Sequence, residues 1–361
     1  MKNVTFPPDL IEEILLLLPA KSLLRFKCVS KLWLSIISDP LFDETYTSAT
    51  QKLLVKFSKS SKAACLDIDA PLRLGRRYPS FLSNIPNPRP SSKRAKKGCR
   101  IDVVGSYRGF LLLKSEYLTD DFIYFLIWNP LTAFQKRFHI QFDKRFNDKV
   151  LCGIGYDSST NDVLVPLILP PRSRSGSLAM EINCFSSRTN SWSCTESTVL
   201  YEYMPKHHRY GLILNGSLHW LVSSYNSHRK KVIAFDMIER RVSEIPLSHD
   251  VDIKMQTEIC HLKVMGGYIC LWFPGFEPEL AEMWVMEEYK VQSSWTPSLF
   301  DLSNFSHPVP NLYFFPICFN KNDQVFGHDD HRHLVKRNGW SSQIISVEPK
   351  ELFHKYDELS Y

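Results

Sequence analysis

The sequence lacks several features that would place it in a familiar class of protein. Its nine cysteines form no C-x-x-C pair and no signal peptide precedes them, so we expect reduced thiols in the cytosol or the nucleus. The longest apolar run near the start, residues 14–18, is far too short to cross a membrane. No glycine-rich phosphate loop of either common form is present, which argues against an enzyme that uses NTP.

A strong charge of one sign is also missing. The 44 basic and 38 acidic residues leave a net charge of only +6, and basic residues gather just once, at residues 93–97. This run could be a nuclear localisation signal, but the adjacent proline-rich stretch "SNIPNPRPSS" favours a solvated loop. We therefore predict no nucleic-acid partner and no membrane partner.

No local pattern carries recognisable catalytic or metal chemistry. A nucleophile paired with a base and an orienting group is not evident, so we predict no catalytic residue and no cofactor. The segment "HDDHRH" offers donors of the metal-ligating types, namely His328, Asp329, His331 and His333. Because one strand and its loop cannot easily close a tetrahedral site, we favour a solvated loop and predict no metal.

The first 45 residues instead have the pattern of three short helices. Asp9 is a candidate N-cap for a helix through "LIEEILLLL", which Pro19 is expected to stop. A second helix starts near Lys21 and runs through "LLRFKCV". A third starts after Ser30 as "KLWLSII" and ends before Pro40.

These helices carry more apolar surface than so small a bundle can bury. On helical spacing, Ile11 and Leu15 form one stripe of the first helix, and a second stripe diverges from it, made of Leu10, Ile14, Leu17 and Leu18. The surplus either packs on the rest of the chain or contacts a partner. Its basic rim, Lys21, Arg25, Lys27 and Lys31, is typical of a protein interface.

The pattern of the long remainder predicts short strands that are separated by two recurring kinds of turn. One kind occurs at Arg108-Gly109, Asn161-Asp162, Asn215-Gly216, Gly266-Gly267 and Asn322-Asp323. The second follows within "FLIWNPLTAFQKRF", "INCFSSRTNSWSC", "VIAFDMIERRVSEIP", "MWVMEEYKVQSSW" and "LVKRNGWSSQII". A repeat of about 50 residues with four strands predicts an all-β, propeller-like domain, with a β-sandwich as the alternative.

The pattern leaves the number of blades open. Five units fit between residues 100 and 345. A sixth could come from "KLLVKFSKSSKAACLDID", completed by the C-terminal "SVEPKELFHKYDELSY", since ring closure removes exposed sheet edges. The tryptophans that recur at equivalent positions are predicted to pack the core rather than to stack on bases: Trp128, Trp192, Trp220, Trp284 and Trp295.

The stretch "FPPDLIEEILLLLPAKSLLRFKCVSKLWLSIISDPLF" resembles the F-box, the helical module of ubiquitin-ligase substrate receptors. It departs from the family visibly at Phe6, where leucine is usual. The remainder resembles the F-box-associated, kelch-like domain of plant F-box proteins, including the S-locus-like class, in phrases such as "IWNPLT", "GIGYDSSTNDVLV", "LNGSLHWL" and "GGYICLW". We accordingly predict an F-box over residues 1–45 and an F-box-associated β domain over residues 46–361.

The resemblance implies a non-catalytic substrate receptor of a Skp–cullin–F-box ubiquitin ligase. The helices would bind a Skp-type adaptor, which connects the receptor to a cullin scaffold. The β domain would bind an unknown target protein for ubiquitination and proteasomal degradation. By family likeness, the docking surface comprises Pro7, Leu10, Ile14, Leu15, Pro19, Leu23, Val29 and Trp33.

For the target we expect one end of the ring, where loops vary while the blades stay fixed. The candidate loops are residues 201–209, 223–231 and 273–282. Their candidate contact residues are Tyr203, His207, Tyr225, His228, Arg229 and Phe276.

Two other functions remain open from the sequence. One is a propeller-type hydrolase or sugar-acting enzyme with an N-terminal helical interaction segment. The other is a scaffold that binds the adaptor without causing degradation of a partner.

Overall fold

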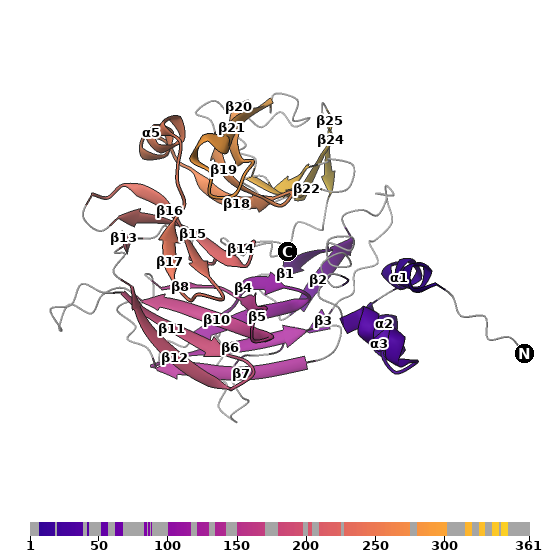
Figure 1. The fold of residues 1–361 in the computed structure, drawn as a ribbon. Helices are drawn as coiled ribbons and strands as arrows, with labels where there is room; N and C mark the ends of the chain where they lie inside the picture. The colour runs from indigo at the N-terminus through magenta and orange to yellow at the C-terminus, as the bar shows by residue number, and fades with distance from the viewer. Residues whose placement is uncertain are drawn as a thin grey trace, which may run out of the picture.

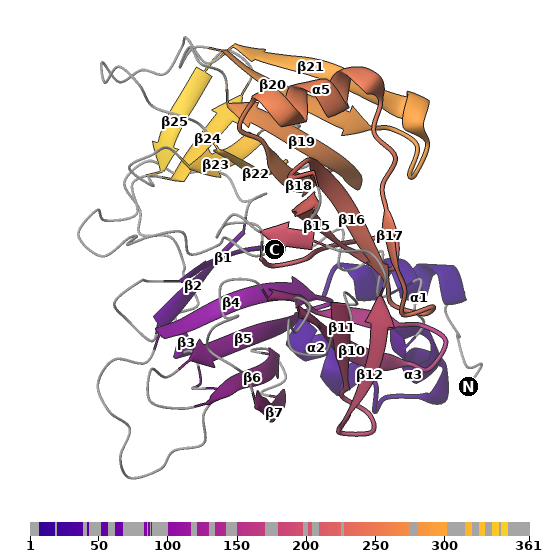
Figure 2. The same cartoon turned by 90° about the vertical axis from the view of Figure 1, so that its left-hand side faces the viewer.

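A computed structural model gives the fold of the 361-residue chain (Figures 1 and 2). It describes residues 7–18, 20–38, 42, 52–56, 62–67, 83–84, 86, 88, 100–116, 121–129, 134–141, 150–169, 180–197, 201–203, 209–224, 227–274, 280–301, 315–319, 325–328, 334–338 and 341–345.

Three short helices precede the sheets, as the sequence predicts: α1 (Pro8–Leu16), α2 (Ala20–Phe26) and α3 (Lys31–Ser38). The expected cap of α1 is wrong, because Pro7 is the N-cap and Asp9 lies inside the first turn. Proline suits the start of a helix, since its φ is already fixed and its missing N–H would have no partner there. Helix α3 starts directly after Ser30, as expected, and the Ser30 hydroxyl accepts a 3.1 Å hydrogen bond from the Trp33 N–H.

The helices share a small core of their own. Ile11 and Leu15 of α1 are buried together with Leu23, Ile37 and Phe42. Leu16, Leu18, Phe26, Trp33 and Ile36 pack around this cluster while remaining partly exposed. The module therefore buries only one of the two apolar stripes of α1.

The rest of the described chain forms six antiparallel sheets, A to F, in chain order (Figure 1). Sheet A is β1 (Lys52–Lys56), β2 (Lys62–Asp67) and β3 (Ser83–Asn84), and sheet B is β4 (Arg100–Tyr107), β5 (Phe110–Glu116), β6 (Phe122–Asn129) and β7 (Phe134–Gln141). Sheet C is β8 (Leu151–Cys152), β9 (Gly155–Asp157), β10 (Asp162–Leu169), β11 (Met180–Ser186) and β12 (Ser191–Ser197).

Sheet D is β13 (Tyr201–Tyr203), β14 (Leu212–Leu214), β15 (Ser217–Ser224), β16 (Lys230–Asp236) and β17 (Val242–Glu244). Helix α5 (His249–Thr257) joins it to sheet E, which is β18 (His261–Met265), β19 (Tyr268–Pro274), β20 (Leu280–Met286) and β21 (Trp295–Asp301). The turn helix η3 (Gln292–Ser294) precedes β21, and sheet F is β22 (Phe315–Phe319), β23 (Val325–His328), β24 (Leu334–Asn338) and β25 (Ser341–Ile345).

Both predicted series of turns join neighbouring strands of one sheet. Arg108-Gly109 connects β4 to β5, and Asn215-Gly216 connects β14 to β15. Both residues of each pair have positive φ, from 47° to 76°, which the tight turn between twisted strands requires. The second series forms the hairpins that end sheets B to F, and the predicted turn at Asn322-Asp323 lies outside the described residues.

Sheets B to E pack face to face in chain order, and this series of antiparallel sheets makes the domain propeller-like rather than a two-sheet sandwich (Figure 2). One buried cluster joins sheets B and C through residues such as Phe125, Phe138 and Phe185. A second joins sheets C and D, with Trp220 and Phe235 inside it. A third joins sheets D, E and helix α5.

The recurring tryptophans do pack these cores. Trp128, Trp220 and Trp295 are buried, and Trp284 packs against the cluster between sheets D and E. The ring of Trp192 contacts those of Phe138 and Phe185. The expectation that aromatic content serves packing is therefore confirmed at all five positions.

The predicted sixth unit begins where expected, as the β1–β2 hairpin. Its third strand in the structure is β3. The C-terminal segment that was predicted to complete it follows residue 345 and lies outside the described residues.

Candidate functional site

The first candidate surface lies on the helices and is apolar. Leu10, Ile14 and Leu17, the second stripe of α1, are 40%, 42% and 86% exposed. Val29, in the turn after α2, is 59% exposed. A module that already has a closed core thus leaves a set of large aliphatic side chains in water, which is typical of a surface that binds another protein. We call Leu10, Ile14, Leu17 and Val29 the helical face.

The structure divides the predicted docking residues into two groups. Pro7, Leu10, Ile14 and Val29 are exposed. Leu15 and Leu23 are instead buried in the core of the module, at 0% and 5% exposure, because they belong to the inward stripe. They hold the helices together and are unavailable to a partner in this conformation.

Trp33 and Pro19 belong to neither group. Trp33 is half-buried and packs edge to face on Phe26, with ring centroids 5.1 Å apart. Pro19 lies outside the described residues. The docking list also omitted three exposed leucines, Leu17, Leu32 and Leu34. The helical spacing of Leu10, Ile14 and Leu17 was the signal that could have added the first of them.

The second candidate surface is one end of the sheets, here called the loop end. In each four-stranded meander the two tight hairpins point to one end, so the connection between the second and third strands points to the other. In sheets D and E these connections follow β15 and β19. The predicted target loops at residues 223–231 and 273–282 therefore lie at the same end of neighbouring sheets.

Few of the predicted target residues can be placed by their side chains. His228 and Arg229 are exposed at the loop end of sheet D. Tyr203 lies in β13, which pairs with the loop end of β15. His207, Tyr225 and Phe276 lie outside the described residues.

Helix α5 links the loop ends of sheets D and E. On the side of sheet D, the Gln256 amide accepts a 2.8 Å bond from the Lys230 N–H and donates a 3.1 Å bond to the Lys230 carbonyl. On the side of sheet E, Lys254 forms ion pairs with Glu258 at 3.0 Å and with Glu282 at 2.9 Å. Burial lowers the pKa of Lys254, but hydrogen bonds with Glu282 and Glu258 outweigh this and raise it above its usual value.

The sequence interpretation missed α5. Its start carries a recognisable signal, since the Ser248 hydroxyl caps the helix and two aspartates, Asp250 and Asp252, lie in the first turn. Val251 and Met255 are its only buried apolar side chains. Two apolar positions are too few to give a clear helical periodicity in a region where the pattern predicts strands.

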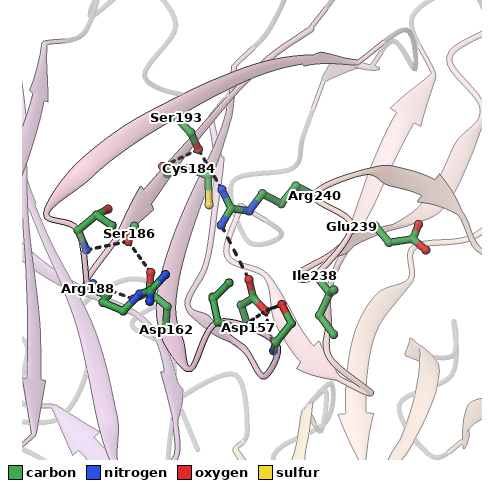
Figure 3. A network of polar contacts seen from close by, with 12 residues as sticks. Asp157, Asp162, Cys184, Ser186, Arg188, Ser193, Ile238, Glu239 and Arg240 are labelled. Atoms are coloured by element: carbon green, nitrogen blue, oxygen red, sulfur yellow. Dashed lines mark hydrogen bonds and ion pairs between the residues drawn. The ribbon is translucent and has the colours of Figure 1, made fainter.

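A polar network at the opposite end of the molecule joins sheets C and D (Figure 3). The Arg240 guanidinium lies 3.8 Å from a carboxylate oxygen of Asp157 and 3.4 Å from the Ser193 hydroxyl. Asp157 also accepts from the Ser159 N–H, the Ser159 hydroxyl and the Thr160 N–H, and these bonds outweigh burial and lower its pKa. The nearby Asp162 accepts from Ser187 and from the Arg188 N–H within its own sheet.

This network contains residue types that also occur in catalytic centres, but its contacts are structural. Burial raises the pKa of the Cys184 thiol to about 12, so that sulfur stays protonated and is a weak nucleophile. The Asp157 carboxylate is committed to the turn that follows it. The contacts therefore fix one sheet against the next.

Two further features concern metal binding and membrane spanning. Within the described ranges, no group of three or more His, Cys, Asp or Glu side chains is placed to hold a metal ion. Of "HDDHRH", only His328 is described, in β23. No helix among the described residues is long and apolar enough to cross a membrane.

The chain matches the F-box domain family over residues 5–45 and the F-box associated beta propeller domain family over residues 83–357. It belongs to the F-box proteins. The resemblance seen in the sequence is therefore confirmed for both parts of the chain. The predicted boundary between residues 45 and 46 stays a prediction.

Relatives of this F-box protein occur in Arabidopsis thaliana. This chain is 26% identical to the F-box protein CPR1, in an alignment that covers 96% of this chain and 83% of CPR1. It is also 26% identical to the F-box/kelch-repeat protein At3g23880, in an alignment that covers 84% of this chain and 82% of that relative. Among solved structures, the Synechocystis apocarotenoid oxygenase mutant aligns with 84% of this chain and 71% of its own, at 10% identity and a TM-score of 0.39.

Proposed function

We propose that this F-box protein is the substrate-recognition subunit of a Skp–cullin–F-box ubiquitin ligase. The observation that carries the proposal is the helical face, a set of exposed aliphatic side chains on a module whose own core is already closed. Family membership supplies the general partner, since an F-box domain implies a Skp-type adaptor. The cullin scaffold would be reached through that adaptor.

The adaptor would contact the exposed members of the predicted set. Pro7, Leu10, Ile14 and Val29 would form the interface, together with Leu17 and the exposed edge of Trp33. Leu15 and Leu23 would act indirectly by holding the helices in register. A stable interface buries about 1,200–2,000 Å², so the adaptor would also contact polar side chains around this face.

The chain's contribution to ubiquitination would be proximity rather than chemistry. A target held by the β domain would lie near a ubiquitin-charged enzyme on the same scaffold, which makes an encounter between two proteins effectively intramolecular. We propose the loop end as the place where the target binds, ubiquitin transfer on other subunits, and the cytosol or nucleus as the compartment. Proteasomal degradation of the target would follow.

Co-expression with a Skp-type adaptor, followed by size-exclusion chromatography, tests the proposal. The native chain should co-elute with the adaptor at equal stoichiometry, and a variant with Ile14→Ser and Val29→Ser should not. Leu299→Ser is a matched control, because Leu299 is 76% exposed on β21 in sheet E. A monodisperse native chain that binds none of several adaptors would refute the proposal and favour the enzyme alternative.

A second measurement separates a degradative receptor from a scaffold. Proteins captured by the native chain in cells should become more abundant when the Ile14→Ser, Val29→Ser variant replaces it. If their abundance stays unchanged while the native chain still binds the adaptor, the scaffold alternative is correct.

A further inference from the structure

The turn between α2 and α3 carries a local positive charge. Residues 14–38 contain four basic side chains and no acidic one. The structure describes the exposure of three of them: Arg25 and Lys31 are exposed, and Lys27 is half-buried. We call these three residues the basic cluster. Lys27 and Lys31 lie two positions before and two positions after Val29 of the helical face, so the positive charge borders an apolar surface.

The basic cluster is not neutralised within the part of the chain that the structure describes. None of its three side chains forms an ion pair there, whereas Lys231 of sheet D, for example, pairs with Glu244. The described acidic side chains of the helical module, Asp9, Glu12 and Glu13, all lie on α1. They leave the charges around the α2–α3 turn without a negative partner among the described residues.

Lys31 occupies a position where the helix itself disfavours a cation. It is the first residue of α3, and the first turn of α3 contains no acidic residue. The N-terminus of a helix carries a partial positive charge, which repels a lysine and attracts an anion. Residues that break such local rules are expected at functional sites. A partner that supplies an anion beside Lys31 would remove this unfavourable interaction.

The backbone of the turn is fixed before any partner binds. Lys27 N–H donates to the Leu23 carbonyl at 3.0 Å. Val29 N–H donates to the Phe26 carbonyl, also at 3.0 Å. The Ser30 hydroxyl then accepts a hydrogen bond from the first turn of α3. A surface fixed in this way loses little conformational freedom on binding.

We infer that Arg25, Lys27 and Lys31 bind an acidic surface of the Skp-type adaptor, beside the apolar contact that covers Val29. Charge complementarity selects carboxylates, because the cluster has no ion pair of its own and the positive end of α3 adds to its charge. The exposed aliphatic side chains next to the cluster favour a protein surface, which combines an apolar centre with a charged rim. This inference rests on the proposed function and adds the sign of the charge that the adaptor presents to the α2–α3 turn.

The affinity of the full-length chain for a purified Skp-type adaptor, measured by biolayer interferometry at two salt concentrations, tests the inference. Raising NaCl from about 0.05 M to about 0.5 M shortens the Debye length from about 14 Å to about 4 Å, and the native chain should lose about tenfold in affinity. Lys31→Glu should lower the affinity about tenfold at the lower salt concentration and about twofold or less at the higher one.

Thermal melting separates this effect from unfolding. Because an acidic residue suits the start of a helix, Lys31→Glu should melt at the same temperature as the native chain or at a higher one. Arg25→Gln changes a different helix and should lower the affinity about threefold at the lower salt concentration. Among adaptor variants that each change one exposed Asp or Glu to Lys, at least one should bind Lys31→Glu more tightly than it binds the native chain.

Arg241→Glu is the matched control. Arg241 is exposed directly before β17 of sheet D, and its replacement changes the net charge of the chain by the same amount as Lys31→Glu. The adaptor affinity of Arg241→Glu should stay within about twofold of that of the native chain at each salt concentration.

An adaptor affinity that is independent of salt and equal for Lys31→Glu and Arg241→Glu would overturn the inference. If the adaptor still co-elutes with the native chain and not with the Ile14→Ser, Val29→Ser variant, the proposed function stands and only the acidic contact is refuted. A native chain that binds no adaptor at either salt concentration would instead refute the proposed function, and this inference with it.

Discussion

Phe138 of sheet B and Phe185 of sheet C stack with their ring centroids 3.9 Å apart and their planes within 6° of parallel. The two residues are separated widely in the sequence and belong to strands of different sheets. Trp192 packs its ring against both, and its indole N–H donates a 3.3 Å bond to the His139 carbonyl. This aromatic contact is where one repeat is fixed onto the next.

Removing one ring of this stack should destabilise the β domain. Phe185→Ala is expected to cost about 3–5 kcal/mol, because it removes a buried ring and leaves a cavity between sheets. Phe134→Ala is the control, since Phe134 lies on the same edge of sheet B but is 45% exposed. Denaturant unfolding followed by tryptophan fluorescence measures both, and equal midpoints for the two variants would contradict the account.

The glycine that directly precedes β14 of sheet D should resist substitution for steric reasons. A Cβ at Gly211 would lie 2.7 Å from a ring carbon of Trp220, whose side chain is buried and cannot move aside. Gly211→Ala is therefore expected to cost about 1–3 kcal/mol through overpacking. Gly267→Ala meets no atom within 4 Å and carries only the strain of its φ of +82°, about 1 kcal/mol. Chemical denaturation should rank Gly211→Ala as the less stable variant, and the reverse order would refute the steric explanation.

The buried histidine between sheets D and E should make stability depend on pH. His219 is held by the Leu212 carbonyl at 3.2 Å and by the Tyr289 hydroxyl at 2.8 Å, so its Nδ1 donates to the carbonyl and its Nε2 accepts from the hydroxyl. Burial lowers the pKa of His219 to about 4, from an ordinary value of 6.5. Between these values the unfolded chain binds a proton that the folded chain does not, so this contribution is complete above pH 6.5 and is lost as the pH falls towards 4.

The limiting slope is about 1.4 kcal/mol per pH unit. Unfolding free energies of the native chain and of His219→Gln, measured in steps across this range, should differ in slope as well as in size. Parallel curves for the two proteins would show that His219 is not the group responsible.

The two stripes of α1 should have separable roles. Leu15→Ala is expected to destabilise the helical module by about 2–5 kcal/mol, because Leu15 is fully buried. Ile14→Ser should leave its stability within about 0.5 kcal/mol, because Ile14 is 42% exposed. Circular dichroism melting tests this, and a stability loss for Ile14→Ser as large as that for Leu15→Ala would place both side chains in the core.

The fold was predictable where local chemistry repeats. Turn pairs such as Arg108-Gly109 and Asn215-Gly216 are strong local signals, and their spacing gave the four-stranded unit and the face-to-face sheets. Helix α5 was missed because its buried stripe is only Val251 and Met255, and because its contacts with Lys230 and Glu282 join residues distant in the sequence.

The site was predictable to a lesser degree. Family likeness named both Ile14 and Leu15 as docking residues, but adjacent positions on a helix point about 100° apart, so only packing decides which one faces inward. At the loop end, Arg229 was identified from its loop, while its orientation by Asp252 depends on a helix that sequence reasoning did not expect.

Hydrogen–deuterium exchange on the full-length chain with and without a Skp-type adaptor tests the central claim most directly. The account predicts that the adaptor slows amide exchange in the segments that carry the helical face, residues 7–18 and 27–34, and leaves sheets B to E unchanged. Slowed exchange in the sheets with no change in these helical segments would contradict it, because the exposed face of the helices would then not be the surface that the adaptor covers.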